Sequence, residues 1–231
     1  MYQPAHGRFT VADPDVVLAE WSAIVPATLV TSGPDGFRTS ILPMLFDPTD
    51  GAHGVLRGHL ARPNGQWSEV EVDGDGEGAR AVAIFHGPDA YVSPSLYEEK
   101  ARTGRVVPTW NYVVIVVHGT LITHDDTDWL LDHVRKLVDR HEAARPEPWS
   151  IDDAPDGYIR GQAKGIVGLE LRIDRIEAKR KLSQNRSDAD VAGVIEAFST
   201  GTSMERAVAA AMRDPHDPVL HSRPHGGDRE E

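Results

Sequence analysis

The sequence contains no cysteine, which excludes disulfides, thiolate nucleophiles and Cys-ligated zinc or iron–sulfur sites. Long apolar runs are also missing, because the longest strongly apolar stretch covers only residues 113–117, far short of a membrane span. The first residues lack the basic region and apolar stretch of a secretory signal. We therefore expect a cytoplasmic protein that does not contact a membrane.

Positive charge is in short supply, since the formal net charge is −12. Phosphate contacts from Lys and Arg supply most non-specific DNA affinity, so this balance opposes direct DNA binding. One segment departs from it: residues 172–186 hold six cationic side chains and two acidic ones. Such a cluster suits a small anion such as a phosphate, or forms the solvated face of a strand.

The common catalytic motifs are absent as well. The chain has no dinucleotide-binding glycine pattern that opens a helix, no Walker A sequence, no H-E-x-x-H and no G-x-S-x-G. Its histidines are scattered singly in the body, and those of the tail are typical of solvated residues. We therefore expect no metal site and assign no catalytic residue.

What the chain does contain is a series of β-like runs separated by turns, with single helices between them. Asp13 and Pro14 predict a helix start, and Pro26 ends that run. Strands are expected at residues 27–31, 38–46, 54–60, 81–86, 109–118, 121–123 and 166–176, the last with buried Val167, Leu169, Leu171 and Ile173. Residues 61–70 are a weak helix candidate.

Helices are clearest towards the C-terminal half. Residues 125–144 place Trp129, Leu130, Val134, Leu137, Val138 and His141 on one face. Two capping boxes, Ser187 with Asp190 and Thr202 with Glu205, predict two further short helices. Short connections favour a mainly antiparallel sheet with peripheral helices. Periodicity leaves a small barrel and an open α+β sheet equally possible.

The richest segment is residues 86–112, which combine aromatic and amide side chains with three prolines and two glycines. Rings offer stacking faces and amides offer donors and acceptors, so the segment suits the wall of a pocket for a flat, polar-edged ligand. A rigid surface loop between two strands is the alternative.

Three other segments carry groups suited to an anion or a heteroaromatic edge. His59 and Arg62 lie where a strand ends, and Arg38, Thr39 and Ser40 lie on an earlier strand. Residues 181–186 set Gln184 and Asn185 between cations. Solvated strand faces and strand ends explain the first two about as well.

Taken together, these segments resemble the PaiB family of FMN-binding negative transcriptional regulators. The matching residues are Met1, Tyr2, Pro4 and His6, residues 58–62 with Asn64, Gln66 and Trp67, residues 85–94, Tyr97 and Lys100, residues 107–112, and residues 181–186. Departures lie at Gly7 and Arg8, which separate His6 from Phe9, at Gly65, where proline is usual, and at Leu96, where an aromatic residue is usual.

The resemblance implies an FMN-binding split β-barrel like that of pyridoxamine-phosphate oxidases, which forms a homodimer with flavin at the subunit interface. It would bind the FMN phosphate through Arg62, His59 and the Arg38, Thr39 and Ser40 strand, with Asn64 nearby. The ring would lie near Trp110 and Asn111, with Gln184 and Asn185 contributed by the partner subunit. Residues 1–186 would form the barrel, 187–213 a helical extension and 214–231 a disordered tail.

Four functions remain open on this fold. The resemblance favours a flavin-binding dimer that regulates transcription negatively. A flavin- or deazaflavin-dependent oxidoreductase is the alternative, because flavin carries hydride chemistry with few catalytic side chains. A direct DNA-binding repressor would need a basic recognition helix, and the helix pair after Ser187 offers only Arg206 and Arg213. A cofactor-free protein acting through partners is the fourth.

Overall fold

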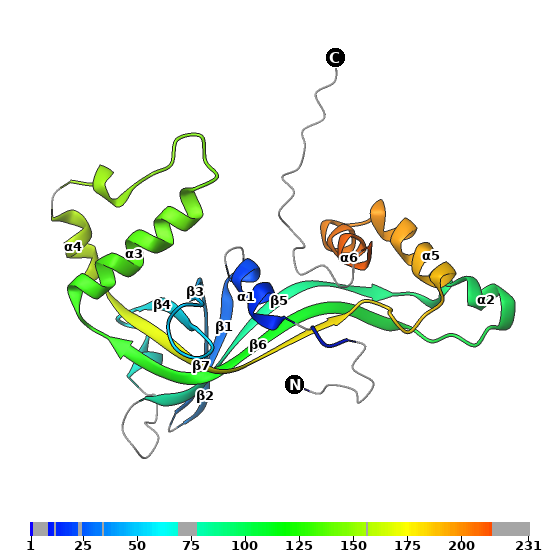
Figure 1. Ribbon diagram of the computed structural model, residues 1–231, viewed down its shortest axis with the longest axis horizontal. Coiled ribbons are helices and arrows are strands. Elements are labelled where there is room, and N and C mark those ends of the chain that lie inside the picture. The colour runs from blue at the N-terminus through cyan, green and yellow to red at the C-terminus, as the bar shows by residue number, and fades with distance from the viewer. Residues whose placement is uncertain are drawn as a thin grey trace. The chain divides into compact units, whose positions relative to one another are not determined.

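The computed structural model describes residues 1, 9–11, 13–22, 25–33, 35–68, 78–155 and 157–213. The expectations for Tyr2, Pro4 and His6 and for the tail beyond residue 213 lie outside this part. The described chain carries a seven-stranded sheet in the order β2-β1-β5-β6-β7-β4-β3, with the helices outside it (Figure 1). The β1–β2, β1–β5, β3–β4 and β4–β7 pairings are antiparallel. The expected antiparallel, mainly β architecture is therefore confirmed.

The strands are β1 (Ala27–Gly33), β2 (Gly36–Leu42), β3 (Leu45–Asp47), β4 (Val55–Ala61), β5 (Ala79–Val92), β6 (Thr109–His124) and β7 (Ile166–Lys181). The helices are α1 (Pro14–Trp21), α2 (Glu98–Thr103), α3 (Thr127–Glu142), α4 (Tyr158–Ala163), α5 (Asp188–Ser199) and α6 (Ser203–Arg213). Three short 3-10 turns complete the set: η1 (Gly65–Trp67), η2 (Pro94–Leu96) and η3 (Ile151–Asp153).

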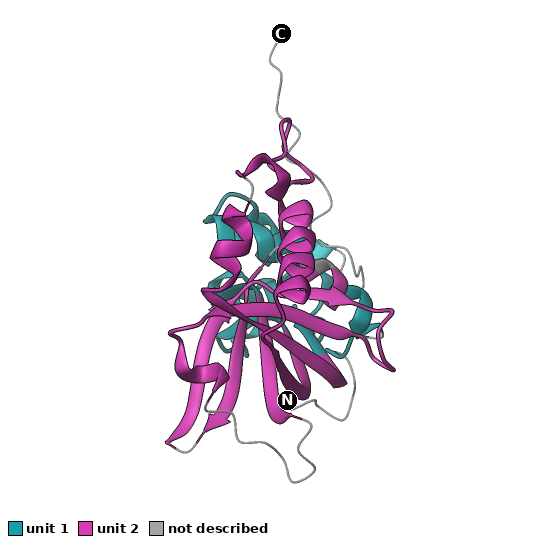
Figure 2. Cartoon of the chain, turned by 90° about the vertical axis from the view of Figure 1, so that its left-hand side faces the viewer, with its two compact units in different colours: residues 1–17, 87–114, 178–231 teal, residues 18–86, 115–177 magenta. Residues whose placement is uncertain are grey.

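The chain divides into two compact units, coloured separately in Figure 2. Unit 1 comprises Met1–Val17, Gly87–Val114 and Ala178–Glu231, and unit 2 comprises Leu18–His86 and Ile115–Glu177. Strands β5, β6 and β7 each contribute residues to both. In unit 2, four strands each contribute a fully buried side chain: Leu29, Leu56, Phe85 and Leu169. Burying one such side chain contributes ~1.5–3 kcal/mol, so this core dominates the unit's stability.

Several predicted boundaries shift for identifiable reasons. The run predicted at 38–46 is two strands, because Pro43, which has no backbone N–H, falls between β2 and β3. The runs at 109–118 and 121–123 are one strand, β6. Gly119 fits inside it because a Cβ there would lie 2.1 Å from the Arg172 carbonyl oxygen, so the glycine permits a close backbone approach. Of the helix predicted at 61–70, the described residues 61–68 form only η1.

The C-terminal helices begin where their caps predict. Ser187 Oγ accepts the Asp190 N–H at 3.2 Å, and Thr202 and Glu205 form a complete capping box. Asp190 does not complete the first box, because its Oδ1 accepts the N–H of Glu99 at 3.0 Å and so ties α5 to α2. Helix α2, inside the aromatic segment, was not predicted.

Candidate functional site

The motif at residues 181–186 forms a tight turn after β7, and nearly every residue in it has a structural partner. Gln184 spans the turn, since its Oε1 accepts the Leu182 N–H at 2.7 Å and its Nε2 donates to the Arg180 carbonyl at 2.6 Å. Ser183 has a φ of 67°, a conformation that side chains other than glycine rarely adopt. Strained backbone of this kind is often found at functional sites.

Asn111, at the start of β6, holds that turn. Its side chain is fully buried, its Oδ1 accepts the Ser183 hydroxyl at 3.1 Å, and its Nδ2 lies 3.3 Å from the Met212 sulfur. A buried amide of this kind fixes the strained residue, because leaving Ser183 without its acceptor would cost ~1–3 kcal/mol. Asn111 and Gln184 were predicted to contact the flavin ring, and in this structure their polar atoms are engaged within the chain.

Between this turn and β6 lies a small pocket, here called the basic pocket, of about 190 Å³. Its lining residues come from the two family-like motifs: Val107, Pro108, Thr109, Asn111, Lys181, Ser183, Asn185 and Arg186. Two of these are cations and none is acidic. Asn185 is exposed and keeps its amide available, in contrast to Gln184.

Both cations of the basic pocket are held in place. Lys181 Nζ donates to Thr109 Oγ1 and to the Trp110 carbonyl. The Arg186 guanidinium lies 4.5 Å from the centre of the Tyr97 ring, an attractive cation–π contact. Burial lowers the pKa of Lys181, and the neighbouring charges of Lys179 and Arg186 lower it further. Cations that repel one another in this way favour a bound anion.

Two large rings in the same unit are open to solvent. Trp110 is 53% exposed and Tyr91 is 49% exposed, and their centroids lie 6.1 Å apart at 66°. Exposed aromatic surface of this size is unusual unless it meets a ligand or a partner. The position predicted for Trp110 beside a flat ligand is compatible with this exposure.

The predicted phosphate residues of unit 2 make mostly internal bonds. Arg62 donates from Nε to the Lys164 carbonyl at 2.8 Å and from Nη2 to the Ile166 carbonyl at 2.9 Å, and it pairs with Asp125. That pair raises the pKa of the guanidinium, which stays charged. Four of its five N–H groups are thus committed to its own chain, so Arg62 fastens the end of β4 to the start of β7.

His59 on β4 faces another histidine. Its Nδ1 lies 3.1 Å from Nε2 of His133 on α3, and burial lowers the pKa of His59. A neutral imidazole offers a phosphate one hydrogen bond and no charge. His133 also packs on Trp129, which stacks on His124 at 4.2 Å, so His59 of β4 and two histidines at and after the end of β6 converge here.

The remaining predicted residues lie around β2 and η1. Asn64 caps η1, with its Oδ1 accepting the Gln66 N–H at 3.1 Å, and its Nδ2 donates to Ser40 Oγ at 2.9 Å. Arg38 and Thr39 are exposed on β2. The structure therefore brings Ser40 and Asn64 together, and it brings Asn111 and Asn185 together in the other unit. The predicted cofactor roles of all ten residues stay predictions.

The predicted site residues did not include Thr109, Lys181 and Arg186, although the cation cluster at residues 172–186 was expected to suit a phosphate. The signal was available, because these residues lie inside the same two motifs as the amides that were chosen. In residues 181–186 the amide side chains were taken as the groups that bind the ring, and the cations as the groups that flank them. In the structure, Gln184 bonds to the backbone of the turn, and Lys181 and Arg186 line the pocket.

Comparison with known proteins identifies the family. Residues 1–175 match the family model described as "Putative FMN-binding domain". The chain is 30% identical over 196 residues to "Protease synthase and sporulation protein PAI 2" of Bacillus subtilis, covering 85% of this chain and 88% of that protein. It is also 32% identical over 217 residues to an uncharacterized protein of Aspergillus fumigatus, covering 78% and 83%.

Solved structures support the fold. The flavocytochrome Anf3 from Azotobacter vinelandii superposes with a TM-score of 0.54 at 11% identity, covering 83% of this chain and 78% of that one. The FAD and heme binding protein from Mycobacterium smegmatis gives 0.50 at 16% identity, covering 78% and 75%. The predicted split-barrel fold, and FMN as the family's cofactor, are confirmed. The chain belongs to the PaiB-type family of FMN-binding split-barrel proteins.

Proposed function

We propose that this chain binds FMN as a homodimer and regulates transcription negatively in response to the bound flavin. The observation that carries the proposal is the basic pocket, in which two family motifs bring Lys181 and Arg186 together without an acidic residue in the lining. The regulatory part of the proposal rests on the resemblance to the PaiB family, to which the Bacillus subtilis protease synthase and sporulation protein is similar.

The residues of the basic pocket fit one end of FMN. A volume of about 190 Å³ is below the ~300–1,000 Å³ of most small-molecule sites, so it suits a phosphate and not a whole flavin. Lys181, Arg186 and the exposed Asn185 amide would hold that phosphate, and Trp110 and Tyr91 offer ring faces for the flavin. When bound, the flavin supplies hydride-transfer chemistry.

A second surface supports the dimer. Strand β2 lies at one end of the sheet order, and Phe37 and Ile41, two strand positions either side of Thr39, are 82% and 75% exposed. Residues that alternate along a strand share one face, so Phe37 and Ile41 project from the same side of this end strand, with Thr39 between them. Exposed apolar side chains grouped in this way often mark an interface, and a second copy of this chain would cover them.

Direct DNA contact is not part of the proposal. The net charge is −12, and the two arginines of α6 are engaged locally: Arg206 Nη1 donates to the Gly201 carbonyl and Arg213 Nη2 to Ser199 Oγ. Regulation through a protein partner fits this surface better. A gel-shift titration at low salt tests this directly, and tight, sequence-selective binding would contradict it.

The flavin site is tested by comparing FMN with riboflavin, which lacks the phosphate. We expect the purified protein to bind FMN more tightly than riboflavin in a fluorescence titration. Lys181→Met, which keeps the aliphatic stem, should weaken FMN binding about tenfold or more, because a hydrogen bond to a charged group contributes ~1.5–3 kcal/mol. Riboflavin binding should be unchanged, and so should FMN binding to Lys164→Met, an exposed lysine of unit 2.

Two outcomes would change the conclusion. If FMN and riboflavin bind equally and Lys181→Met has no effect, the basic pocket is not the phosphate site. If bound flavin is bleached by NAD(P)H and reoxidised over many turnovers, a flavin-dependent oxidoreductase becomes the better description.

A further inference from the structure

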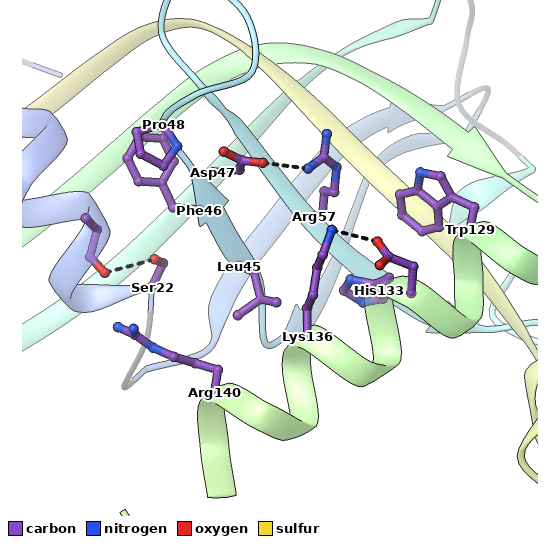
Figure 3. A pocket seen from close by; sticks show the side chains of 12 residues that line it. Ser22, Leu45, Phe46, Asp47, Pro48, Arg57, Trp129, His133, Lys136 and Arg140 are labelled. Atoms are coloured by element: carbon purple, nitrogen blue, oxygen red, sulfur yellow. Dashed lines mark hydrogen bonds and ion pairs between the residues drawn. The ribbon is translucent and has the colours of Figure 1, made fainter. Parts of the chain in front are cut away.

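A second, larger pocket lies within unit 2, and none of the predicted flavin residues lines it. Its volume is about 630 Å³, within the ~300–1,000 Å³ typical of small-molecule sites. We call it the α3 pocket. It is lined by Ala19, Ser22, Leu45, Phe46, Asp47, Pro48, Arg57, Trp129, Asp132, His133, Lys136 and Arg140 (Figure 3).

One wall is a stripe along helix α3. Trp129, His133, Lys136 and Arg140 are spaced by three or four residues, so a 3.6-residue helix places them on one face. The two rings, Trp129 and His133, therefore lie towards the start of the helix, and the two cations, Lys136 and Arg140, lie towards its end. Figure 3 shows these side chains projecting from α3 towards β3.

The opposite wall is apolar. Leu45 and Phe46 of β3 and the following Pro48 line it, and Figure 3 shows them across the pocket from α3. Together with the Trp129 ring they offer contact surface for a hydrocarbon or aromatic body. A purely inorganic anion would leave this wall in contact with water, so the lining selects a ligand with an apolar part.

The charges in the pocket are not equally available. Arg57 is neutralised by three carboxylates, with Nε on Glu170 at 3.0 Å, Nη1 on Asp47 at 3.0 Å and Nη2 on Asp50. Lys136 pairs with Asp132 at 2.7 Å, but both side chains are about 60% exposed, and exposed pairs of this kind exchange easily. Lys136 can therefore turn to a ligand.

Arg140 is the free cation. Among the residues that the structure describes, it has no hydrogen bond and no ion pair, and its side chain lines the pocket. A guanidinium presents a planar fork that matches a carboxylate or phosphate group. Arg140 and Lys136, one helical turn apart, thus give the pocket one end that favours an anion.

His133 also lines the pocket. Its ring is 2% exposed, and its Nδ1 has no hydrogen-bond partner within the described part of the chain. Buried polar atoms normally have partners, but Nδ1 is not accessible from the pocket, so His133 contributes ring surface to the lining. This ring is neutral, so it adds no charge to the pocket.

We propose that the α3 pocket is a separate ligand site for a small organic acid, with an apolar body against Leu45, Phe46 and Trp129 and its anionic group on Arg140 and Lys136. The site does not depend on FMN binding, so it stands or falls apart from the proposed flavin function. Carboxylates and phosphate esters share the required chemistry.

The test uses 1-naphthoate, its neutral methyl ester and 1-naphthyl phosphate as probes in calorimetry of the whole protein. We expect naphthoate to bind at least tenfold more tightly than the ester. Arg140→Gln should remove that preference and leave the ester unaffected, while Phe46→Ala should weaken both. The matched control is Arg145→Gln, an exposed arginine beyond α3 that pairs with Glu142 outside the pocket, and it should bind like the unaltered protein. The ratio of naphthoate to naphthyl phosphate affinity then identifies the preferred anion.

Three results would overturn the proposal: no binding of either anion, equal binding of acid and ester, or an Arg140→Gln variant that binds naphthoate normally. Titrations with and without saturating FMN complete the design. Displacement of naphthoate by FMN would show that the pocket belongs to the flavin and would also overturn the proposal. If FMN fails to bind anywhere while naphthoate binds as expected, the flavin function fails and the α3 pocket stands.

Discussion

The buried imidazole of His133 makes the protein sensitive to acid in a way that can be calculated. Burial, aided by the interaction with the neighbouring His59 ring and by the positive charge of Arg57, lowers the pKa of His133 to about 3. In the unfolded chain the same ring has a pKa of about 6.5. Between pH 6.5 and pH about 3 the ring is protonated in the unfolded state and neutral in the folded state. The free energy of unfolding therefore falls as the pH falls through this range.

The size of the effect follows from the two pKa values. Above pH 6.5 the ring is neutral in both states and contributes no pH dependence. Between pH 7.5 and pH 5.0 the unfolded state gains about 2 kcal/mol relative to the folded state, at 1.36 kcal/mol per pH unit below 6.5. The loss would continue down to pH about 3, where the folded ring also becomes protonated.

The variant His133→Phe removes the titration and keeps a ring against Trp129, which lies 5.5 Å away at 25°. It also loses the 3.1 Å contact to His59, so its stability at pH 7.5 will be lower, and the informative quantity is the change with pH. Urea unfolding at pH 7.5, 6.0 and 5.0 should show that the variant loses about 2 kcal/mol less than the unaltered protein over this range.

The matched control is His141→Phe, the same substitution at an exposed position of α3. It should retain the acid sensitivity of the unaltered protein. If His133→Phe and the unaltered protein lose the same stability between pH 7.5 and 5.0, the ring is not shielded as the structure requires. NMR of the labelled histidine ring gives a direct check, because the His133 signals should show no protonation above pH 5.

Further predictions address packing, the turn and the dimer edge. Gly168→Ala should lower the free energy of unfolding by ~1–3 kcal/mol, because a Cβ there would lie 2.2 Å from the Trp129 ring, and a urea titration measures it. Asn111→Ala should cost ~1–3 kcal/mol by leaving a buried hydroxyl unpaired, whereas Asn185→Ala should lower FMN affinity with unchanged stability; equal effects on both quantities would contradict this division. Ile41→Glu should convert the proposed dimer to monomers in light scattering, because the side chain is 75% exposed and a charge there would oppose burial against a second copy.

The secondary structure was predictable where it depends on local chemistry. Ser187 and Thr202 cap their helices as their side chains require, and the alternating Val167, Leu169, Leu171 and Ile173 of β7 are all buried. Prediction failed where a distant segment decides. Gly119 reads as a break between strands, yet the glycine is there because the Arg172 carbonyl approaches it from β7.

In helix α3, too, contacts with a distant segment decide which residues of one face are buried. Periodicity predicted it and its apolar stripe, but placed His141 on the buried face and left His133 out. The structure has His141 exposed and His133 buried, because His59 of β4 and the Trp129 ring provide a partner and a stacking face for the neutral imidazole. The contact with His59 joins residues 74 positions apart, so no window of sequence contains it.

The same limit applies to the candidate site. A polar side chain in a motif can bind a ligand or form hydrogen bonds within its own chain, and its residue type does not determine which. Gln184 and Arg62 form hydrogen bonds with backbone groups of their own chain, so they stabilise the local structure and have few donors left for a ligand. Donors remain in the two pockets. In the basic pocket, Lys181 commits two of its three N–H groups and Arg186 lies over the Tyr97 ring, and in the α3 pocket Arg140 has no partner among the described residues. A cation that is held in place near other cations, with no carboxylate in the pocket lining, gains most from an anion, and for this reason we propose residues 181–186 for the flavin phosphate in preference to Arg62.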